Sequence, residues 1–498
     1  MSKELSLFAL LSQGLEATIR DDNPWWRGER IAGLPPLRRW AFEPVLNGLK
    51  IGLAPITVLR GPRQVGKTTL LNQIIHALLD EGVTPDRIFR VQFDELPRLK
   101  ELSEPILELC RWYAESILRK SFNRAAGEGQ KAFVVLDEVQ NLSDWAPQLK
   151  HLVDMNPVRV LVTGSSALRI EAGRDSLAGR IMTLEMGPLL LREIAEFRTQ
   201  WRLKPLLPPN GLAPLKEKGF WKELRAYGET HREVRQAAFE AFSERGAYPV
   251  AQVRIDQPWE KVADFLNETV IRRAIQHDLR MGAKGQKRDE QLLEEVFRLA
   301  CRYAGQSPTP ALYLEEIKGA MHANIGPQRV RAYLKFLDGT LLIRLVEPLE
   351  LRLKRRRGAP KICLCDHALR AAWLQEVVPL TPEGLANAPH LSVLAGHLAE
   401  SAAGYFMGSL PNLDFAHFAE RGAEPEVDFI ATVGERRIPI EVKYRRRIDH
   451  QDTLGLRAFM DKPHYNAPFA LLVTLMDEEA SEDPRIVSLP LSSLLLMR

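Results

Sequence analysis

Residues 51–190 alternate short apolar runs with amphipathic stretches. The runs are rich in β-branched side chains, as in buried parallel strands, and after the first run apolar residues recur at helical spacing over residues 69–79. The pattern therefore predicts an α/β domain over residues 51–190, preceded by a helical segment over residues 1–50. Its strands are predicted at residues 56–59, 87–93, 133–136, 158–162 and 181–184.

The rest of the chain changes pattern twice. Residues 191–285 are predicted to form a helical lid with a proline-rich insertion at residues 204–219. Three short amphipathic helices followed by strands then predict a winged helix over residues 286–380. A second α/β domain is predicted over residues 385–498. Its first elements are one helix and two strands, at residues 394–406, 427–430 and 438–443.

A glycine-rich loop follows the first predicted strand. Residues 61–69 read Gly-Pro-Arg-Gln-Val-Gly-Lys-Thr-Thr and fit G-x-x-x-x-G-K-[ST], the phosphate-binding P-loop. Strand, loop and helix N-terminus together form a cradle whose backbone N–H groups face phosphate. Lys67 is expected to reach the β- and γ-phosphates and Thr68 to contact Mg²⁺. The motif predicts a site for ATP and Mg²⁺ that includes Gly61, Gly66, Lys67, Thr68 and Thr69.

Acidic residues end the third predicted strand. Asp137 is expected to hold Mg²⁺ and Glu138 to polarise the attacking water, as in a Walker B element; the alternative is a polar cap on the sheet edge. Ser165, at the tip of the next strand, is placed to sense the γ-phosphate. Arg180 is a candidate arginine finger for a neighbouring subunit, or an ordinary surface arginine. A strand between the two Walker motifs is typical of catalytic-glutamate (ASCE) P-loop proteins.

The motifs NPWW, GPRQVGKTT, LDEVQN, TGSSA and SLAGR occur in this order. Together they resemble a family of bacterial and archaeal AAA+-like ATPases, in which the ATPase module is fused to a C-terminal domain of unknown function. The resemblance implies a homo-oligomer, with a hexamer favoured. It also places residues 246–249 in the lid near the base, with Pro249 as a nucleotide contact and Ala247 where glycine is usual. Trp25 and Trp26 are expected to stack on adenine or, as we prefer, to pack.

Basic residues gather in the predicted winged helix. One group lies on its third helix and the other at the tip of its β-hairpin, where DNA phosphates are contacted in such folds. A solvated turn or a protein contact is the alternative. The predicted DNA-binding residues are Arg329, Arg331, Lys335, Lys354, Arg355, Arg356 and Arg357.

The last hundred or so residues carry a second set of acids, Glu400, Asp428 and Glu441, followed by Lys443. Glu441 and Lys443 are two apart and share a strand face, and a hairpin brings Asp428 beside them. The order resembles the PD-(D/E)xK nuclease superfamily, although Val427 replaces the usual proline. Asp428 and Glu441 are then Mg²⁺ ligands, and all four residues are catalytic. The predicted backbone contacts that follow are Arg445, Arg446 and Arg447.

The composition excludes few classes of protein function. The chain has 498 residues, 45% apolar and 27% charged, and a net charge of +4, so nucleic-acid affinity requires local patches. Four cysteines without a C-x-x-C pair argue against a zinc or redox motif and fit a reducing cytoplasm. No run of apolar residues is long enough for a membrane span.

These features predict an ATP-hydrolysing DNA-processing machine that couples an AAA+-like motor to a Mg²⁺-dependent nuclease-like domain. Branched DNA such as Holliday junctions is the substrate expected by analogy. One alternative is a nucleotide-gated switch whose nuclease fold is inert and binds a protein partner. Another is a defence nuclease that ATP controls.

Overall fold

The computed structural model describes residues 11–94, 99, 102–142, 144–165, 175–208, 211–278, 289–321, 325–350, 358–420 and 424–498. Contacts divide the chain into two compact units. The first comprises Met1–Pro62 and Gly66–Met186, and the second comprises Arg63–Val65 and Gly187–Arg498. Among the described residues, no helix combines the length and apolarity needed to cross a membrane.

The first unit contains a five-stranded sheet in which every neighbouring pair is parallel, in the order β2-β3-β4-β1-β5. β4 therefore lies between the P-loop strand β1 and the acidic strand β3, as expected for the catalytic-glutamate class. The strands are β1 (Ile56–Arg60), β2 (Ile88–Gln92), β3 (Phe133–Asp137), β4 (Arg159–Gly164) and β5 (Ile181–Glu185). The helices are α1 (Gln13–Asp21), α2 (Phe42–Ile51), α3 (Lys67–Asp80), α4 (Pro105–Tyr113), α5 (Phe122–Gly127) and α6 (Trp145–Met155).

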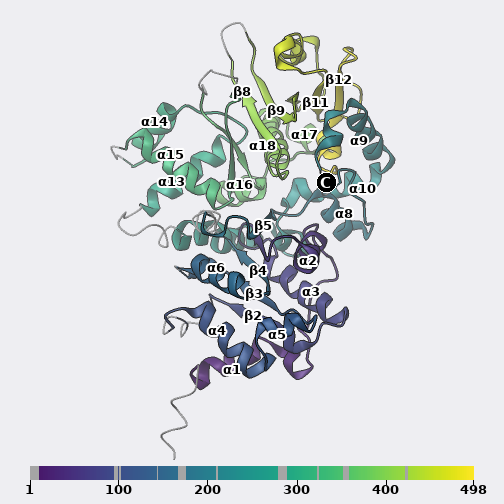
Figure 1. Ribbon diagram of the computed structural model, residues 1–498. Helices are drawn as coiled ribbons and strands as arrows, with labels where there is room; N and C mark the ends of the chain where they lie inside the picture. Colours follow the sequence, from purple (N-terminus) through teal and green to yellow (C-terminus); the bar gives the residue numbers. More distant parts are fainter. Residues whose placement is uncertain are drawn as a thin grey trace, which may run out of the picture. The chain divides into compact units, whose positions relative to one another are not determined.

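Both faces of this sheet are covered by helices (Figure 1). Alternate strand residues such as Val58, Val134 and Val160 pack in one core with side chains of α1, α4, α5 and α6. On the other face, α2 packs against β1 and β4. Because neither face meets water, successive residues of the central strands are apolar on both faces, as in Val134-Val135-Leu136 of β3, which explains the continuous apolar runs in the sequence.

The second unit contains two sheets. The larger has five strands in the order β12-β11-β10-β9-β8, with β8, β9 and β10 antiparallel and β10, β11 and β12 parallel. The smaller pairs β6 with β7 in antiparallel fashion. The strands are β6 (Ile343–Val346), β7 (Lys361–Leu364), β8 (Asp414–Phe418), β9 (Val427–Val433), β10 (Arg436–Lys443), β11 (Ala470–Thr474) and β12 (Ile486–Pro490).

Helices make up most of the remainder of this unit. They are α8 (Leu191–Thr199), α9 (Lys218–Thr230), α10 (Arg232–Arg245), α11 (Pro249–Val253), α12 (Trp259–Leu266), α13 (Glu290–Arg302), α14 (Pro310–Met321), α15 (Pro327–Gly339), α16 (His367–Leu374), α17 (Pro382–Asn387), α18 (Ser392–Gly408), α19 (Leu454–Met460) and α20 (Leu491–Leu494). The described part of residues 267–278 continues from α12 in π-helical turns.

One helix links the two sheets of the second unit. α18 packs against β6, β7, β8, β9 and β10. At Gly404 the approach is so close that an added Cβ would lie 2.5 Å from Cys363 Sγ and 2.6 Å from the Phe429 ring. Glycine is therefore required at this position. The Leu364 N–H donates to Ser401 Oγ (2.8 Å), which fixes β7 on the same helix.

Of the predicted lid helices, α9 packs against β12 and α20 at the end of the chain, and α10 packs against α20. Arg235 of α10 is almost fully buried there, and its guanidinium contacts Asp477 (2.8 Å) and Ser493 Oγ (2.7 Å). A buried arginine requires such partners because an unpaired buried charge is strongly destabilising. The finer division of this unit into lid, winged helix and nuclease-like domain stays a prediction.

Candidate functional sites

The P-loop lies between β1 and α3 and is built as its sequence predicts. Gly66 adopts a left-handed conformation (φ 91°) immediately before the first residue of α3, where a side chain would be strained. Lys67 is buried, and its Nζ donates to the carbonyl oxygens of Gly61 (3.0 Å) and Pro62 (2.8 Å). The predicted phosphate-binding residues thus surround a single helix N-terminus, with Thr68 and Thr69 in its first turn.

The carboxylate of Asp137, at the end of β3, is held by two hydroxyl groups. Thr68 Oγ1 donates to Asp137 Oδ2 (3.0 Å), and Thr163 Oγ1 donates to Asp137 Oδ1. Thr163 Oγ1 also accepts from the Glu138 N–H (3.1 Å). The pair predicted to hold Mg²⁺, Thr68 and Asp137, is therefore assembled. Thr163 was missed as a site residue, although it lies in the TGSSA motif.

Glu138 follows Asp137 in a left-handed conformation (φ 53°), which turns its side chain away from the strand direction. Its Oε1 lies 3.9 Å from Lys67 Nζ. Gln140 Nε2 donates both to Glu138 Oε2 and to Ser165 Oγ (3.0 Å). Gln140 therefore connects the two residues predicted to act at the γ-phosphate. Its place in the LDEVQN motif was the available signal.

Burial raises the pKa of Asp137 above its usual range, and the hydrogen bond from Thr163 opposes this shift. Arg90, buried on the neighbouring strand β2, lies 3.7 Å from Asp137 Oδ2. A lone arginine inside an apolar strand was the sequence signal for this residue, which we did not predict as part of the site. These neighbours favour the ionised form of Asp137, the form that binds a cation.

Other predicted residues of the first unit lie as follows. Arg180 precedes β5, and its Nη2 pairs with Asp154 Oδ2 (3.0 Å) of the same chain. Trp25 and Trp26 both donate their indole N–H to the Ile88 carbonyl (2.9 Å), so they have packing roles at the edge of β2. This is the preferred of the two expectations.

In the second unit, Pro249 begins α11. The two residues before it, Ala247 and Tyr248, are buried; Ala247 N donates to Asp366 Oδ2 (2.6 Å). A contact of Pro249 with nucleotide stays a prediction.

The described cations predicted to contact DNA are exposed. Those of α15 are Arg329, Arg331 and Lys335, and those after β10 are Arg445, Arg446 and Arg447. Arg445 pairs with Asp452, and Arg446 donates to the Pro382 carbonyl (3.4 Å). Lys354, Arg355, Arg356 and Arg357 lie outside the described residues.

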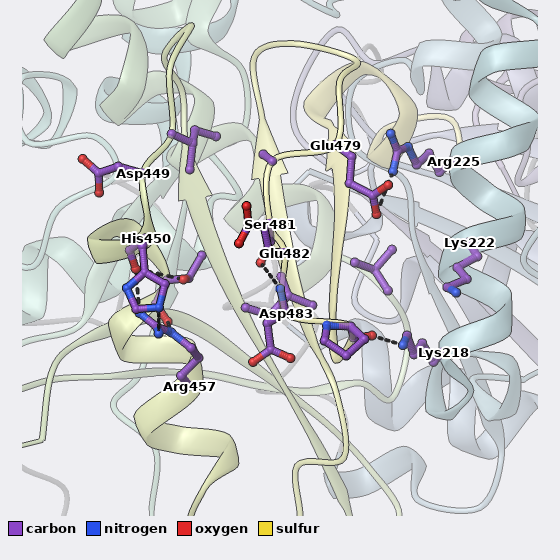
Figure 2. Close-up of a pocket in the computed structure, with 16 residues that line it drawn as sticks. Lys218, Lys222, Arg225, Asp449, His450, Arg457, Glu479, Ser481, Glu482 and Asp483 are labelled. Atoms are coloured by element: carbon purple, nitrogen blue, oxygen red, sulfur yellow. Dashed lines mark hydrogen bonds and ion pairs between the residues drawn. The ribbon is translucent and has the colours of Figure 1, made fainter.

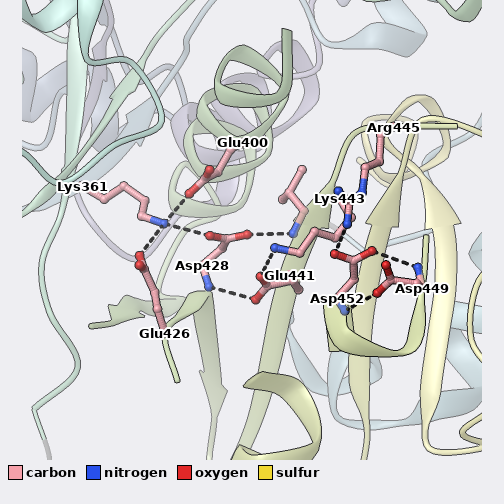
Figure 3. Close-up of polar contacts among 10 residues, drawn as sticks. Lys361, Glu400, Glu426, Asp428, Glu441, Lys443, Arg445, Asp449 and Asp452 are labelled. Atoms are coloured by element: carbon pink, nitrogen blue, oxygen red, sulfur yellow. Dashed lines mark hydrogen bonds and ion pairs between the residues drawn. The ribbon is translucent and has the colours of Figure 1, made fainter. Parts of the chain in front are cut away.

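The C-terminal acids meet at the β9–β10 hairpin (Figure 3). Ile440 pairs with Phe429, so Asp428 and Glu441 occupy the next positions along the two strands. Asp428 Oδ2 accepts from the Val442 N–H (2.9 Å), and Glu441 Oε2 lies 3.4 Å from the Asp428 N–H. Lys443 Nζ donates to Glu441 Oε1 (2.6 Å). The structure thus brings three of the four predicted nuclease residues into direct contact.

A lysine that we did not predict lies among these acids. Lys361, the first residue of β7, pairs with Glu400 of α18, with Asp428 Oδ1 (3.1 Å) and with Glu426 Oε1 (3.4 Å). Only 2% of its side chain is exposed. Figure 3 shows the ammonium pointing between Glu400 and Asp428. The fourth predicted residue, Glu400, joins the cluster through Lys361 and through a side-chain hydrogen bond with Asp428.

The charged groups of this cluster shift one another's pKa values. Burial alone would lower the pKa of Lys361, yet Asp428 and Glu400 raise it well above its ordinary value. Burial and Asp428 raise the pKa of Glu441 to about 8, against the effect of Lys443. Burial also raises the pKa of Glu400. Burial opposes ionisation of Asp428, but Lys361, the hydrogen bond from Glu400 and the Val442 amide together lower the pKa of Asp428. Lys361 and Asp428 are consequently the firmly ionised pair at the centre.

A cavity of about 1250 Å³ lies beside α9 in the second unit (Figure 2). Its walls mix the two charge signs: Lys218, Arg225 and Arg457 face acids such as Glu479 and Asp483. Arg225 pairs with Glu479 (3.6 Å), and Lys218 donates to the Pro484 carbonyl. None of the predicted nuclease residues lines it. The mixed lining gives no single-sign field for a charged ligand.

Three known domain families match parts of this chain. A model of an AAA domain matches residues 54–195, which contain the P-loop, Asp137, Glu138 and Ser165. The chain thus carries an AAA+-like ATPase, as the motifs predicted. Two domains of unknown function match the second unit, DUF8612 at residues 236–377 and DUF4143 at residues 396–494. The latter range contains most of the acid cluster, but not Lys361.

Three curated relatives match only part of the chain. An uncharacterized protein of Methanocaldococcus jannaschii is 31% identical over 138 residues, which are 28% of this chain and 27% of that protein. Uncharacterized proteins of Mycobacterium bovis and Mycobacterium tuberculosis are each 28% identical over 162 residues, 32% of this chain and 31% of theirs. The matches thus span about a third or less of these relatives' lengths.

Solved structures give weaker likenesses. A Walker-type ATPase of Pyrococcus abyssi has 15% identity and a TM-score of 0.42, covering 69% of this chain and 99% of that one. Cdc6p of Pyrobaculum aerophilum has 13% identity and a TM-score of 0.27, covering 69% and 95%. Drosophila ORC bound to DNA has 16% identity and a TM-score of 0.26, covering 70% and 88%. At these scores the likenesses carry no argument about function.

Proposed function

We propose that the AAA domain hydrolyses ATP and that the nucleotide cycle controls a C-terminal half that engages DNA without cutting it. The observation that supports ATP chemistry is the contact between Thr68 and Asp137 (3.0 Å) beside the P-loop. A hydroxyl and a carboxylate in this position are the ligands that P-loop enzymes offer to Mg²⁺. The residues present therefore fit the metal.

In this proposal the P-loop amides and Lys67 bind the phosphates, and Thr68 with Asp137 holds Mg²⁺. The metal, when bound with ATP, neutralises charge that develops on the phosphates. Glu138 orients the attacking water and accepts its proton. Gln140 is a positioning residue because it holds the Glu138 carboxylate next to Ser165.

Steady-state phosphate release tests the ATPase assignment. We expect Lys67→Ala to abolish ATP binding and Glu138→Gln to keep binding while turnover falls. Binding of a fluorescent ATP analogue separates the two effects. Wild-type turnover in both variants would contradict the assigned roles.

An oligomer is part of the proposal because the sequence predicts Arg180 as an arginine finger for a neighbouring subunit. Its pairing with Asp154 within the chain would have to open in the assembly. Mixing Arg180→Ala with Glu138→Gln protein tests this: each variant alone is expected to be slow, and the mixture should regain turnover at interfaces that combine an intact Arg180 with an intact Glu138. Wild-type turnover by Arg180→Ala alone would exclude the finger. Sedimentation then counts the subunits, a hexamer being expected.

DNA engagement is supported by two exposed groups of cations, Arg329, Arg331 and Lys335 on α15 and Arg445 to Arg447 after β10. Contacts of this kind weaken steeply with salt. Replacing Arg329, Arg331 and Lys335 by serine should lower both DNA affinity and the slope of its salt dependence. The matched control replaces the exposed residues Arg272, Arg302 and Lys318. Equal DNA affinity in wild type, variant and control would instead favour a switch with a protein partner.

Mg²⁺-dependent cleavage, whether of branched DNA or in defence, is the alternative that the sequence predicts. The contact of Asp428, Glu441 and Lys443 supports it, and the position of Lys361 opposes it. Incubating linear and four-way-junction DNA with Mg²⁺, with and without ATP, compares wild type with Glu441→Ala. We expect no cleavage by either protein. Cleavage by the wild type alone would establish a nuclease.

A further inference from the structure

The C-terminal acid cluster already contains a cation. Lys361 Nζ lies between three carboxylates, with Asp428 Oδ1 at 3.1 Å, Glu426 Oε1 at 3.4 Å and Glu400 in closer contact. A metal ion shared by the predicted acids would have to lie beside the same Asp428 oxygen. The ammonium and the metal therefore compete for one position.

The lysine is fixed in this position by its surroundings. Lys361 pairs with Val346 across the β6–β7 ladder, and three residues further on the Leu364 N–H is bonded to Ser401 of α18. Its ammonium also lies 5.1 Å from the centre of the Phe429 ring, which stabilises a cation. Moving a buried, paired ammonium out of such a site leaves its carboxylate partners uncompensated, which is strongly destabilising.

Each oxygen that a metal would need also accepts a hydrogen bond, which takes up one of its two lone pairs. Asp428 Oδ1 accepts from Lys361 and Oδ2 from the Val442 amide (2.9 Å). Glu441 Oε1 accepts from Lys443 (2.6 Å), and Oε2 faces the Asp428 amide (3.4 Å). Mg²⁺ requires about six oxygen ligands in near-octahedral geometry and is reluctant to give up water. The residues present do not fit that metal.

We propose that Lys361 replaces the divalent metal of this cluster, so that the nuclease-like domain keeps its architecture but takes no metal and performs no phosphodiester chemistry. The lysine joins β7, α18 and β9 in the way that a structural metal would. This inference deepens the proposed function and rests on it for the expectation that the C-terminal half does not cut DNA. It concerns the cluster itself and is independent of whether the partner is DNA.

A titration with Mn²⁺, monitored by electron paramagnetic resonance, tests directly whether Lys361 takes the place of a metal. All proteins carry Asp137→Asn, which removes the metal-binding carboxylate of the ATP site. The set is completed by Lys361→Met, which keeps the buried stem and removes the charge, by Lys361→Arg, which keeps the charge, and by Lys361→Met combined with Asp428→Asn.

We expect one Mn²⁺ to bind Lys361→Met about 10-fold or more tightly than the parent protein, because a like charge beside the metal is gone. The parent, Lys361→Arg and the Asp428→Asn combination should show no such site. One Mn²⁺ bound by the parent as tightly as by Lys361→Met, and lost in the Asp428→Asn combination, would overturn the proposal. So would a Lys361→Met protein that folds and still binds none.

Thermal unfolding covers the case in which Lys361→Met is too unstable for titration. If the lysine replaces a metal, Mn²⁺ should raise the unfolding temperature of Lys361→Met and leave that of the parent unchanged, because only the variant binds the ion in its folded state. An equal effect of Mn²⁺ on both proteins would contradict the proposal. None of these readouts depends on ATP turnover or on DNA, so they fail independently of the proposed function.

Discussion

The described part of the chain contains two sites in which a buried lysine lies near acidic side chains at strand ends. In the AAA-like domain, Lys67 Nζ donates to the carbonyl oxygens of Gly61 and Pro62 and lies 3.9 Å from Glu138 Oε1. In the C-terminal cluster, Lys361 Nζ lies directly on Glu400 and Asp428. The acids near Lys67 can therefore bind a metal, whereas the acids around Lys361 are neutralised by that lysine.

The donors that hold the central aspartate differ in the same way. Asp137 is held by the hydroxyls of Thr68 and Thr163, and a hydroxyl can turn and offer its own lone pairs to a metal. Asp428 is held by the Lys361 ammonium and the Val442 amide, which have no lone pairs to offer. The two groups of acids, although similar in sequence, therefore differ in their ability to bind a metal ion.

The largest expected effect is the loss of folding stability when Lys361 is removed. Lys361→Ala should lower the free energy of unfolding by about 3–5 kcal/mol, because removing one partner of a buried ion pair leaves the other charge uncompensated. Denaturant unfolding followed by tryptophan fluorescence and circular dichroism measures the change.

The matched control is Arg272→Ala in the same unit. Arg272 pairs with Glu268 one helical turn away, and both side chains are about half exposed. Such pairs contribute about 0.5 kcal/mol or less. Equal losses in the two variants would mean that Lys361 is not the centre of a buried cluster.

The next effect concerns turnover at the first site. Glu138→Gln should lower kcat for ATP about 100-fold or more, since general-base catalysis contributes that much. Lys361→Met should hydrolyse ATP at the wild-type rate per folded chain. A phosphate-release assay, normalised to the ATP-binding fraction, compares them. A large loss of ATP turnover in Lys361→Met would mean that the two sites are functionally linked.

Gln140→Ala should have a smaller effect on the same reaction. Without the amide, the Glu138 carboxylate loses its partner and its link to Ser165, so kcat should fall about 10-fold with KM nearly unchanged. Gln148→Ala is the control, because Gln148 is also buried in this unit but accepts from the Ile106 N–H instead. A matching fall in kcat for Gln148→Ala would indicate general destabilisation.

Much of the first unit could be predicted because its signals are local. The strand predicted at residues 133–136 is observed as Phe133–Asp137, and the P-loop is contiguous in sequence. Both rest on apolar runs and glycine turns that do not depend on distant partners. The helix predicted at residues 394–406 is likewise observed as Ser392–Gly408.

Lys361 could not be predicted in the same way. Its partners Glu400 and Asp428 are 39 and 67 residues away, and a lysine at the start of a strand carries no local sign of burial. Only the packing of β7 on α18 brings the three together. The acids of the motif could be predicted from spacing, whereas the cation that changes their chemistry comes from another element of the fold.

The smallest effect is a pH dependence of stability at Glu441. Burial raises the pKa of this carboxyl to about 8, so in the folded chain it keeps its proton over a range in which the unfolded chain has lost it. Stability is then fully present below the unfolded pKa and declines as pH rises toward 8, by up to about 1.4 kcal/mol per pH unit. Between pH 6 and 7 the wild type should lose about 1 kcal/mol that Glu441→Gln keeps.

Unfolding midpoints at pH 6 and pH 7 measure this difference, which corresponds to about 3 °C. Glu435→Gln is the control, since Glu435 lies exposed in the turn of the same hairpin and its variant should follow the wild type. If Glu441→Gln also loses stability between the two pH values as the wild type does, the Glu441 carboxyl is ionised beside Lys443. The acid cluster would then hold one more negative charge, and the contrast with the ATP site would be smaller than the geometry indicates.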